Sequence, residues 1–222
     1  MTNTLRNSKE DSLALLTFLQ YSLARRVEFQ NKLGYLNSIG GCDVYYCGKY
    51  AYVCVCLIRI SDFSVIEKVI IKREVKFPYI SGYFCFREGP LLLEALDRLN
   101  SKPDCLLVDG NGVLHPRGMG LASFVGIFVR IPTIGCAKSL LLGDYRRPAP
   151  LKGGFSYIKL KKKVVGIALR TKNNVKEIFV SVGWGVNILR AKDIVLGLSK
   201  YRIPEPIRLA HYFASMAVHK KV

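Results

Sequence analysis

Apolar residues follow two different spacings along the chain, and the change between them separates an opening helix from a series of strands. Between residues 11 and 33 apolar side chains recur every three or four positions, as at Leu13, Leu16 and Leu23, which is the spacing of one face of an α-helix. From about residue 38 to 75 the chain instead carries β-branched and aromatic runs separated by two short polar turns. We therefore expect a helix over 11–33 and then three strands in an antiparallel meander.

The middle of the chain reads as a helix followed by a strand–helix–strand unit. Proline is favoured in the first turn of a helix, so Gly89-Pro90 predicts a helix start, with Glu88 just ahead of it. The run PDCLLVDGNG predicts a buried strand that ends in an acid and a glycine-rich turn, and 119–129 predicts the helix that returns to a strand around PTIGCAK. This order is typical of a right-handed parallel crossover.

The remaining third predicts further strands and two closing helices. The segments FSYIKLKKKVVGIALR and KEIFVSVGWG have strand composition, and helices are expected at 187–199 and 205–219. We find no internal repeat and no linker long enough to separate two domains. The sequence thus predicts a single α/β domain over 1–222, with a mixed sheet of antiparallel and parallel strands and helices on both faces.

Composition narrows the class of protein. Half of the 222 residues are apolar and 23% are charged, which excludes disordered and low-complexity architectures. The seven cysteines form no zinc-type CxxC pair and fall mostly within apolar runs, so we interpret them as buried thiols. The first residues lack the apolar stretch of a secretion signal, and no apolar run is long enough to span a bilayer. We expect a cytoplasmic protein that is not associated with a membrane.

Charge favours a polyanionic partner. The formal net charge is +18, and residues 146–222 hold 17 Lys and Arg against three Asp and Glu. An excess of this size is typical of nucleic-acid binding, although a merely soluble basic surface is the alternative. The basic stretch 146–163 also carries Phe155 and Tyr157. Such a mixture suits contact with a nucleic-acid backbone and its bases, and its alternative is a solvated hairpin.

Three acidic residues stand where apolar neighbours predict burial or a helix end. Asp43 interrupts the first strand, Asp109 ends the strand LLVD, and Glu88 precedes the expected helix. Buried carboxylates need a cation or several hydrogen-bond donors, and carboxylates are the ligands that magnesium and manganese prefer. The alternatives are an ordinary turn residue for Asp109 and a favourable helix-dipole contact for Glu88. Spacing alone leaves open whether the three meet.

Several motifs in a fixed order carry a resemblance to a known family. The stretch PYISGYFCFREGP is followed by PDCLLVDGNGVLHPRGMGLASFVG and then by PTIGCAKSLL. Together they resemble endonuclease V, a ribonuclease H-like nuclease, strongly over residues 38–145 and more weakly through VVGIALR and RIPEPIRLAH. The resemblance implies a ribonuclease H-like fold.

The resemblance also implies an activity. The family cleaves nucleic acid that contains inosine, the product of adenosine deamination, at the second phosphodiester on the 3′ side of the lesion. It leaves 3′-hydroxyl and 5′-phosphate ends in nucleic-acid repair, and its members act on DNA or RNA. We expect a monomer that uses Mg²⁺, with Mn²⁺ as a possible substitute. Two alternatives stay open, a non-catalytic nucleic-acid-binding protein of the same fold and a structure-specific nuclease that does not require inosine.

Catalytic roles are implied for six residues that match the family motifs. Three of them would hold the metal and three would assist, as follows: Asp43, Glu88 and Asp109 as metal ligands, Lys138 beside the phosphate, His115 near the scissile phosphate and His211 in support of the metal site. Without the resemblance, Lys138 and both histidines read as ordinary solvated or locally bonded side chains.

A wedge and a base pocket are implied by the same matches. An enzyme that detects an altered base rotates it out of the stack and fills the gap, and the family's Pro-Tyr-Ile-Pro-Gly wedge appears here with Ser81 in place of the second proline. Another departure is Trp184, where relatives tend to have histidine, and we assign it no catalytic role. The residues implied in lesion binding are Tyr79, Ile80, Gly82, Phe84, Gly110, Gly112, Leu121 and Leu141.

Overall fold

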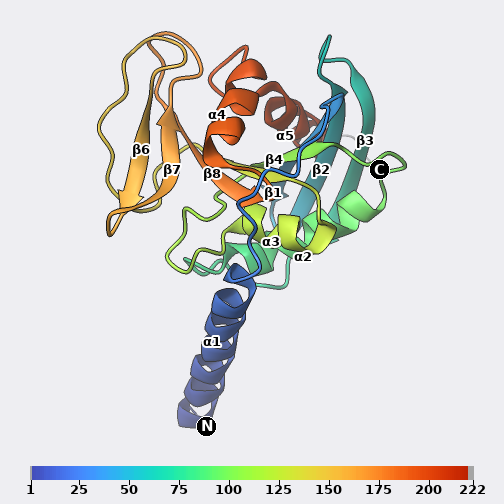
Figure 1. Ribbon diagram of the computed structural model, residues 1–222. Helices are drawn as coiled ribbons and strands as arrows, with labels where there is room; N and C mark the ends of the chain where they lie inside the picture. Colours follow the sequence, from blue (N-terminus) through green and yellow to red (C-terminus); the bar gives the residue numbers. More distant parts are fainter. Residues whose placement is uncertain (1, 220–222) are drawn as a thin grey trace.

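A computed structural model describes residues 2–219, with side chains described over 11–218, and it contains one eight-stranded mixed sheet (Figure 1). The strand order is β3-β2-β1-β4-β5-β8-β7-β6. The strands are β1 Ser38–Cys47, β2 Tyr50–Arg59, β3 Val65–Glu74, β4 Cys105–Asp109, β5 Thr133–Ala137, β6 Phe155–Leu160, β7 Lys163–Leu169 and β8 Ile178–Trp184. The helices are α1 Thr2–Ala24, α2 Phe84–Asp97, α3 Leu121–Val129, α4 Ile188–Gly197 and α5 Glu205–His219.

The sheet has the predicted mixture of antiparallel and parallel pairs. Strands β1, β2 and β3 form the antiparallel meander, whereas β4 pairs in parallel with both β1 and β5. The β4–α3–β5 unit is the expected crossover, and β8, β7 and β6 complete the sheet in antiparallel order. The predicted ribonuclease H-like α/β fold is confirmed.

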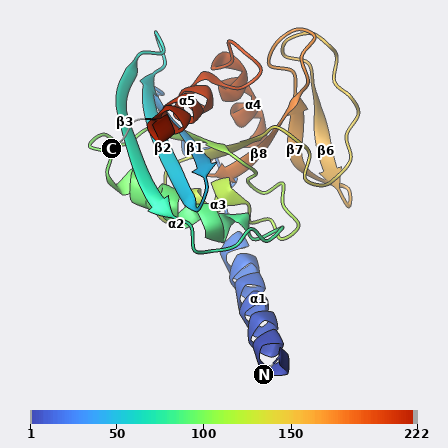
Figure 2. The ribbon, with the colours of Figure 1, turned by 180° about the vertical axis from the view of Figure 1, so that it is seen from behind.

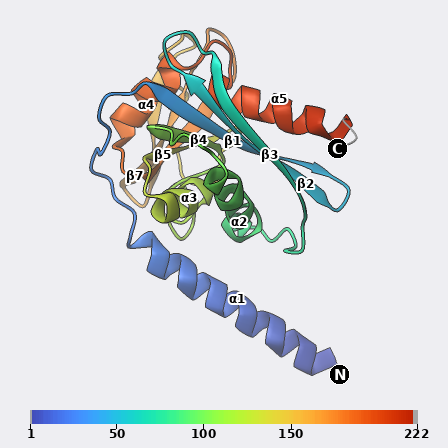
Figure 3. The same cartoon turned by 90° about the vertical axis from the view of Figure 1, so that its right-hand side faces the viewer.

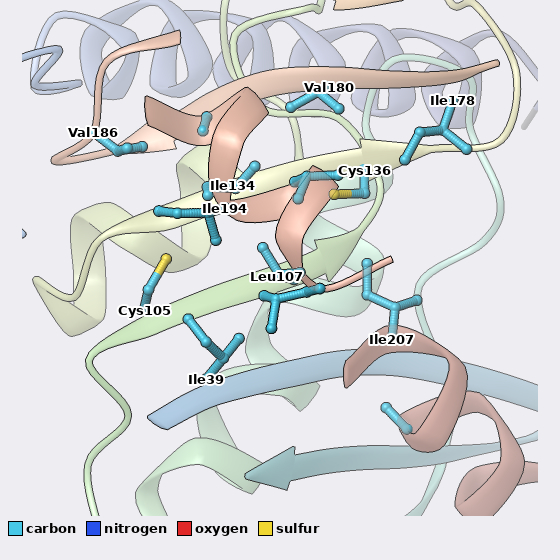
Figure 4. Close-up of a cluster of buried hydrophobic side chains, with 14 of the residues drawn as sticks. Ile39, Cys105, Leu107, Ile134, Cys136, Ile178, Val180, Val186, Ile194 and Ile207 are labelled. Atoms are coloured by element: carbon cyan, nitrogen blue, oxygen red, sulfur yellow. The ribbon is translucent and has the colours of Figure 1, made fainter. Parts of the chain in front are cut away.

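Helices cover both faces of the sheet and enclose two apolar cores (Figure 2). Helices α4 and α5 lie on one face, where Ile194 and Ile207 pack on Ile39, Leu107 and Val180 (Figure 4). Helices α2 and α3 lie on the other face with the core of that side. Alternate residues of the central strands therefore point into different cores, as the period of two along a strand requires.

The opening helix is shorter at its C-terminal end than the apolar spacing predicts. Helix α1 ends at Ala24 and projects from the α2 and α3 side of the sheet (Figure 3), so the prediction of helix through residue 33 was wrong. Val27 keeps the helical spacing but lies after the helix, where it packs against Ile127 and Trp184. Burial in this small cluster is why an apolar residue recurs there.

Helix α2 begins earlier than proline indicates. It starts at Phe84, so Pro90 lies inside the helix and Glu88 lies within its second turn rather than ahead of it. The prediction of a start at Gly89-Pro90 was wrong because Cys85, which precedes the proline, is buried, and packing of this extra turn outweighs the hydrogen bond that proline removes. Glu88 is thus a buried helix carboxylate rather than a partner of a helix N-terminus.

The cysteines agree with the prediction of buried thiols. All seven cysteines are free, and all but Cys47 are buried. Within the described part of the chain, no helix combines the length and the apolar character that crossing a bilayer requires.

Candidate functional site

Asp43 and Asp109 lie side by side at the centre of the sheet. Strands β1 and β4 are parallel neighbours with Cys42 opposite Val108, so the next residue on each strand is an acid. Burial, together with the negative charge of Asp43 and a side-chain hydrogen bond to it, raises the pKa of Asp109 to about 6 against the opposing effect of Lys138. The two carboxylates are therefore close enough to share a proton or a cation.

Glu88 reaches the same place from helix α2. The Tyr46 hydroxyl on β1 donates a hydrogen bond to Glu88 Oε1 at 2.8 Å. Burial, with a smaller contribution from the charges of Asp43 and Asp109, raises the pKa of Glu88 to about 8 despite the Tyr46 hydrogen bond. Because the charges of both aspartates raise the pKa of Glu88, the three acids lie in one electrostatic cluster. Spacing along the chain had left open whether they meet.

Lys138 and His211 each bind one of these acids. Lys138 follows β5, the next parallel strand, and its Nζ donates to Asp109 Oδ2 at 2.5 Å. Partial burial lowers the pKa of Lys138, but the charge of Asp109, its hydrogen bond and the charge of Asp43 together raise it by more. His211 on α5 places Nδ1 2.8 Å from Asp43 Oδ2, while half of its side chain stays exposed.

Helix α5 can deliver His211 because β1 has a glycine at the point of contact. A Cβ atom on Gly41 would lie 2.0 Å from the carbonyl oxygen of Pro206, at the start of α5. No side chain fits at that distance, so glycine lets the two backbones touch. The same contact positions the helix that brings His211 over Asp43.

The oxygens of these carboxylates are chemically suited to a divalent cation, although two of them are bonded to protein side chains here. Among the described residues, no group of three or more His, Cys, Asp or Glu side chains is arranged so that it could hold a metal ion. Asp43 and Asp109 are bonded to His211 and Lys138 instead. Clustered buried carboxylates with raised pKa values nevertheless repel one another when ionised, and hard cations bind such oxygens.

A second cluster holds the loop before α2. The backbone carbonyl of Gly82 accepts hydrogen bonds from Gln20 Nε2 at 3.0 Å, from His115 Nε2 at 3.1 Å and from Arg117. Arg117 also donates to Gln20 Oε1, and its guanidinium lies over the Tyr83 ring at 4.4 Å. Three donors from two separate segments, α1 and the HPRG loop, therefore fix the end of the loop 78–82.

His115 belongs to this cluster in the structure. The ring is buried, and its Nδ1 accepts a hydrogen bond from the Arg117 backbone while Nε2 donates to Gly82. Burial, followed by the charge of Arg117, lowers the pKa of His115 to about 4. The ring is therefore neutral near pH 7 and acts as a hydrogen-bond donor to the loop; its role near a phosphate stays a prediction.

The residues implied in lesion binding fall into two structural groups. Tyr79 is 71% exposed at the tip of the loop, so it is free to contact a ligand. Gly110, with φ +155°, adopts a backbone conformation that favours glycine and lies against the buried Leu121. Glycine is needed at position 112 for a different reason, because a Cβ atom on Gly112 would lie 1.9 Å from the Val182 carbonyl oxygen on β8. Ile80 and Phe84 are half-buried and Leu141 is exposed.

Sequence reasoning missed residues that hold the site without ligating anything. Tyr46 binds Glu88, Arg202 donates to the Lys138 carbonyl at 2.8 Å, and Gln20 fixes the loop. Arg117 stood within the HPRG motif, which was a usable signal, but Gln20 lies 62 residues from its partner Gly82 and no local pattern marks it.

Comparison with known proteins gives consistent matches over almost the whole chain. The family model described as Endonuclease V matches residues 21–212. Endonuclease V of Dictyoglomus turgidum is 41% identical over 205 residues, which cover 92% of this chain and 90% of that protein.

Solved structures match at the level of the fold as well. The crystal structure of endonuclease V from Streptomyces avermitilis superposes with a TM-score of 0.88 and 34% identity, covering 93% of this chain and 92% of that one. Endonuclease V of Ciona intestinalis, in complex with a 24mer DNA containing an inosine followed by a ribo-adenosine, has a TM-score of 0.83 and 26% identity. That match covers 94% of this chain and 98% of the Ciona chain.

Proposed function

Because this chain belongs to the endonuclease V family of hydrolytic nucleases, we propose that it is a metal-dependent endonuclease acting on inosine-containing DNA. In the proposed reaction, water attacks phosphorus at the second phosphodiester 3′ to inosine and the bond to the 3′-oxygen breaks. The products are a 3′-hydroxyl and a 5′-phosphate. RNA with inosine is the second substrate class that this site suits.

One observation carries the proposal: Asp43 on β1 and Asp109 on the adjacent β4 lie together with Glu88 of α2, and Lys138 lies beside them. Hydrolysis of a phosphodiester needs an activated water, neutralised charge on the non-bridging oxygens and help for the departing oxygen. These three carboxylates would hold the divalent ion, Mg²⁺ or Mn²⁺, and a bound ion supplies those effects.

The surrounding side chains complete the proposed site. Lys138 carries a positive charge that a substrate phosphate can attract away from Asp109, which frees the carboxylate for a cation. His211 hydrogen-bonds Asp43 and fixes the direction of its carboxylate, so we assign it a positioning role.

The loop 78–82 suits a wedge that enters the nucleic-acid strand. Its tip presents the exposed Tyr79, while Gln20, His115 and Arg117 hold Gly82 at its base. A firmly held base limits the mobility that Ser81 introduces where the family wedge has a second, more rigid proline. Tyr79 would stack on a base next to the extruded inosine.

A direct cleavage assay tests the proposed function. End-labelled DNA and RNA oligonucleotides with a single inosine are incubated with the protein and Mg²⁺, beside matched adenosine oligonucleotides and a chelator control. We expect inosine-dependent cuts at the second phosphodiester that disappear with EDTA. Cleavage that is equal on adenosine substrates would favour a structure-specific nuclease, and salt-sensitive binding without any cut would favour a non-catalytic binding protein.

The wedge assignment gives a separate prediction. We expect Tyr79→Ala to weaken binding of an inosine oligonucleotide by about 10-fold, since stacking on an aromatic ring contributes about 1–3 kcal/mol per base. The cleavage rate of the saturated complex in a single turnover should change much less, because Tyr79 lies outside the carboxylate cluster. Tyr35→Ala, which removes another highly exposed tyrosine to which no contact with nucleic acid is assigned, is a matched control. Equal losses in binding and in saturated rate would contradict a wedge role.

A further inference from the structure

A basic cavity lies at the C-terminal end of α1, and its lining contains no residue of the proposed active site. It has a volume of about 430 Å³, and its lining includes Arg25, Arg26, Lys32, Arg130 and Trp184. Glu28 is the acid of this lining, and it is paired with Lys32 at 2.5 Å. The lining thus carries four positive charges against one negative charge.

Three of these positive charges have no partner among the side chains that the structure describes. The side chains of Arg25, Arg26 and Arg130 form neither a hydrogen bond nor an ion pair with any residue whose side chain the structure describes. Guanidinium groups at one cavity repel each other unless an anion lies between them. Planar guanidinium groups bind phosphate oxygens through paired hydrogen bonds, so phosphate is the anion they suit best.

The far wall of the cavity is held in place by the end of β8. Lys32 donates a backbone hydrogen bond to Gly185 at 2.9 Å, and Gly185 donates to the Glu28 carbonyl at 2.8 Å. The Lys32 ammonium lies 4.5 Å from the centre of the Trp184 ring, and Trp184 is itself buried against Ile127. The wall is therefore formed before any ligand binds.

Arg130 occupies a position that usually belongs to glycine. It caps α3 in the left-handed conformation, with φ 54°, and this conformation costs a residue with a Cβ atom about 1 kcal/mol. Glycine would remove that cost but would also remove the guanidinium from the cavity. The strained backbone is consistent with a function for the side chain.

The cavity lies within reach of a strand that passes the loop 78–82. Helix α1 contacts the base of this loop through Gln20 and ends four residues later at Ala24, about 6 Å along the helix, and Arg25 follows directly. A nucleic-acid strand carries one phosphate per about 3.4 Å of helical rise. A strand that leaves the loop along α1 therefore brings backbone phosphates to the cavity.

From these observations we propose that Arg25, Arg26 and Arg130 form a phosphate-binding site for the backbone of the substrate's flanking strand. The inference rests on the proposed function only in its choice of nucleic acid as the source of the phosphate. The site would add affinity without selecting the base, and it would make binding depend on how far the strand extends beyond inosine.

Trp184 allows the site to be tested without any activity. It is the only tryptophan in the chain, so a ligand that draws Lys32 away from its ring should change tryptophan fluorescence. We expect tripolyphosphate to produce a saturable change at constant ionic strength and to do so much more weakly with Arg25→Gln/Arg130→Gln. The control is Lys68→Gln/Lys72→Gln, which removes the same charge from β3, at the edge of the sheet.

A second arm identifies the source of the phosphate. Binding of inosine oligonucleotides with short and long flanks is measured over a range of salt concentrations. The arginine variant should bind the long oligonucleotide about 10-fold more weakly than wild type, with a salt slope smaller by about 1 per lost contact, whereas short oligonucleotides should be little affected. The saturated single-turnover cleavage rate should equal that of wild type.

The outcomes separate this site from the nuclease itself. Absence of a fluorescence response in wild type, or an equal response in the arginine variant, would overturn the cavity as a phosphate site even if inosine is cleaved. A normal fluorescence response with no effect of the variant on long oligonucleotides would overturn nucleic acid as its source. Absence of cleavage by wild type, with the fluorescence response intact, would instead contradict the proposed function and leave the phosphate site standing.

Discussion

Asp43→Asn is expected to lower the rate of inosine-dependent cleavage by about 1,000-fold or more while the protein stays folded. Asparagine keeps the size of the side chain but removes the charge that would bind a divalent ion, and that ion supplies several kcal/mol of the barrier reduction. The measurement is a single-turnover assay at saturating enzyme and Mg²⁺. Circular dichroism of the same sample reports whether the fold is retained.

The same variant should be at least as stable as wild type without metal. Burial raises the pKa of Glu88 to about 8, and Asp43 contributes to that rise. A carboxyl group whose pKa is higher in the folded state than in the unfolded state binds more protons when folded. The metal-free protein should therefore lose stability as the pH increases from the ordinary range of Glu to about 8.

Removing the Asp43 charge should reduce this loss. Thermal melting in EDTA at about pH 5 and pH 8 measures this loss of stability. We expect the melting temperature to decrease less between the two pH values for Asp43→Asn than for wild type. Asp62→Asn, which changes an exposed acid in the β2–β3 turn, is the matched control. If Asp43→Asn unfolds the protein at pH 8, then Asp43 is a structural residue and its assignment as a metal ligand fails.

Gly41→Ala is expected to disturb both the fold and the site, although it adds only a methyl group. The new Cβ would meet the backbone of Pro206 at 2.0 Å, and this backbone cannot move without α5. Overpacking of this kind costs about 1–3 kcal/mol, so the melting temperature should fall by about 2–12 °C for a protein of this size. Differential scanning calorimetry measures the change.

We expect Gly41→Ala to impair cleavage even at temperatures where the protein remains folded. A displaced α5 separates His211 from Asp43, so Gly41→Ala should lose at least as much activity as His211→Ala at a temperature where both remain folded. Gly197→Ala is the control, because a Cβ at that glycine meets nothing within 4 Å. Wild-type stability in Gly41→Ala would mean that the close contact between α5 and β1 does not exist.

The outline of the fold follows from the sequence because strand and helix periods are local. The meander over 38–75 and the crossover through 119–129 depend on neighbours a few residues away, and both are present as predicted. The predictions for the C-terminal end of α1 and for the start of α2 were wrong because packing outweighed the local signals. Val27 is apolar to fill a cluster after the helix, and Pro90 is tolerated inside a helix whose first turn is buried.

The residues of the candidate site also divide into those that the sequence marks and those that only the structure shows. An acid inside an apolar strand marks Asp43, and the VDGNG turn marks Asp109, so both are visible in the sequence. Glu88 carried a plausible local explanation as a partner of a helix start, which the structure removes. The contacts of Gln20 with Gly82 have no sequence signal, because 62 residues separate them.

The sequence by itself determined the residue types, the local elements and the family to which they belong. Only the tertiary structure decided that β1, β4 and β5 stand side by side and thereby bring Asp43, Asp109 and Lys138 together. It also decided that α5 approaches β1 closely enough for His211 to reach Asp43. The physical reason is that local propensity acts over a few residues, whereas strand order and close approach depend on the packing of the whole chain.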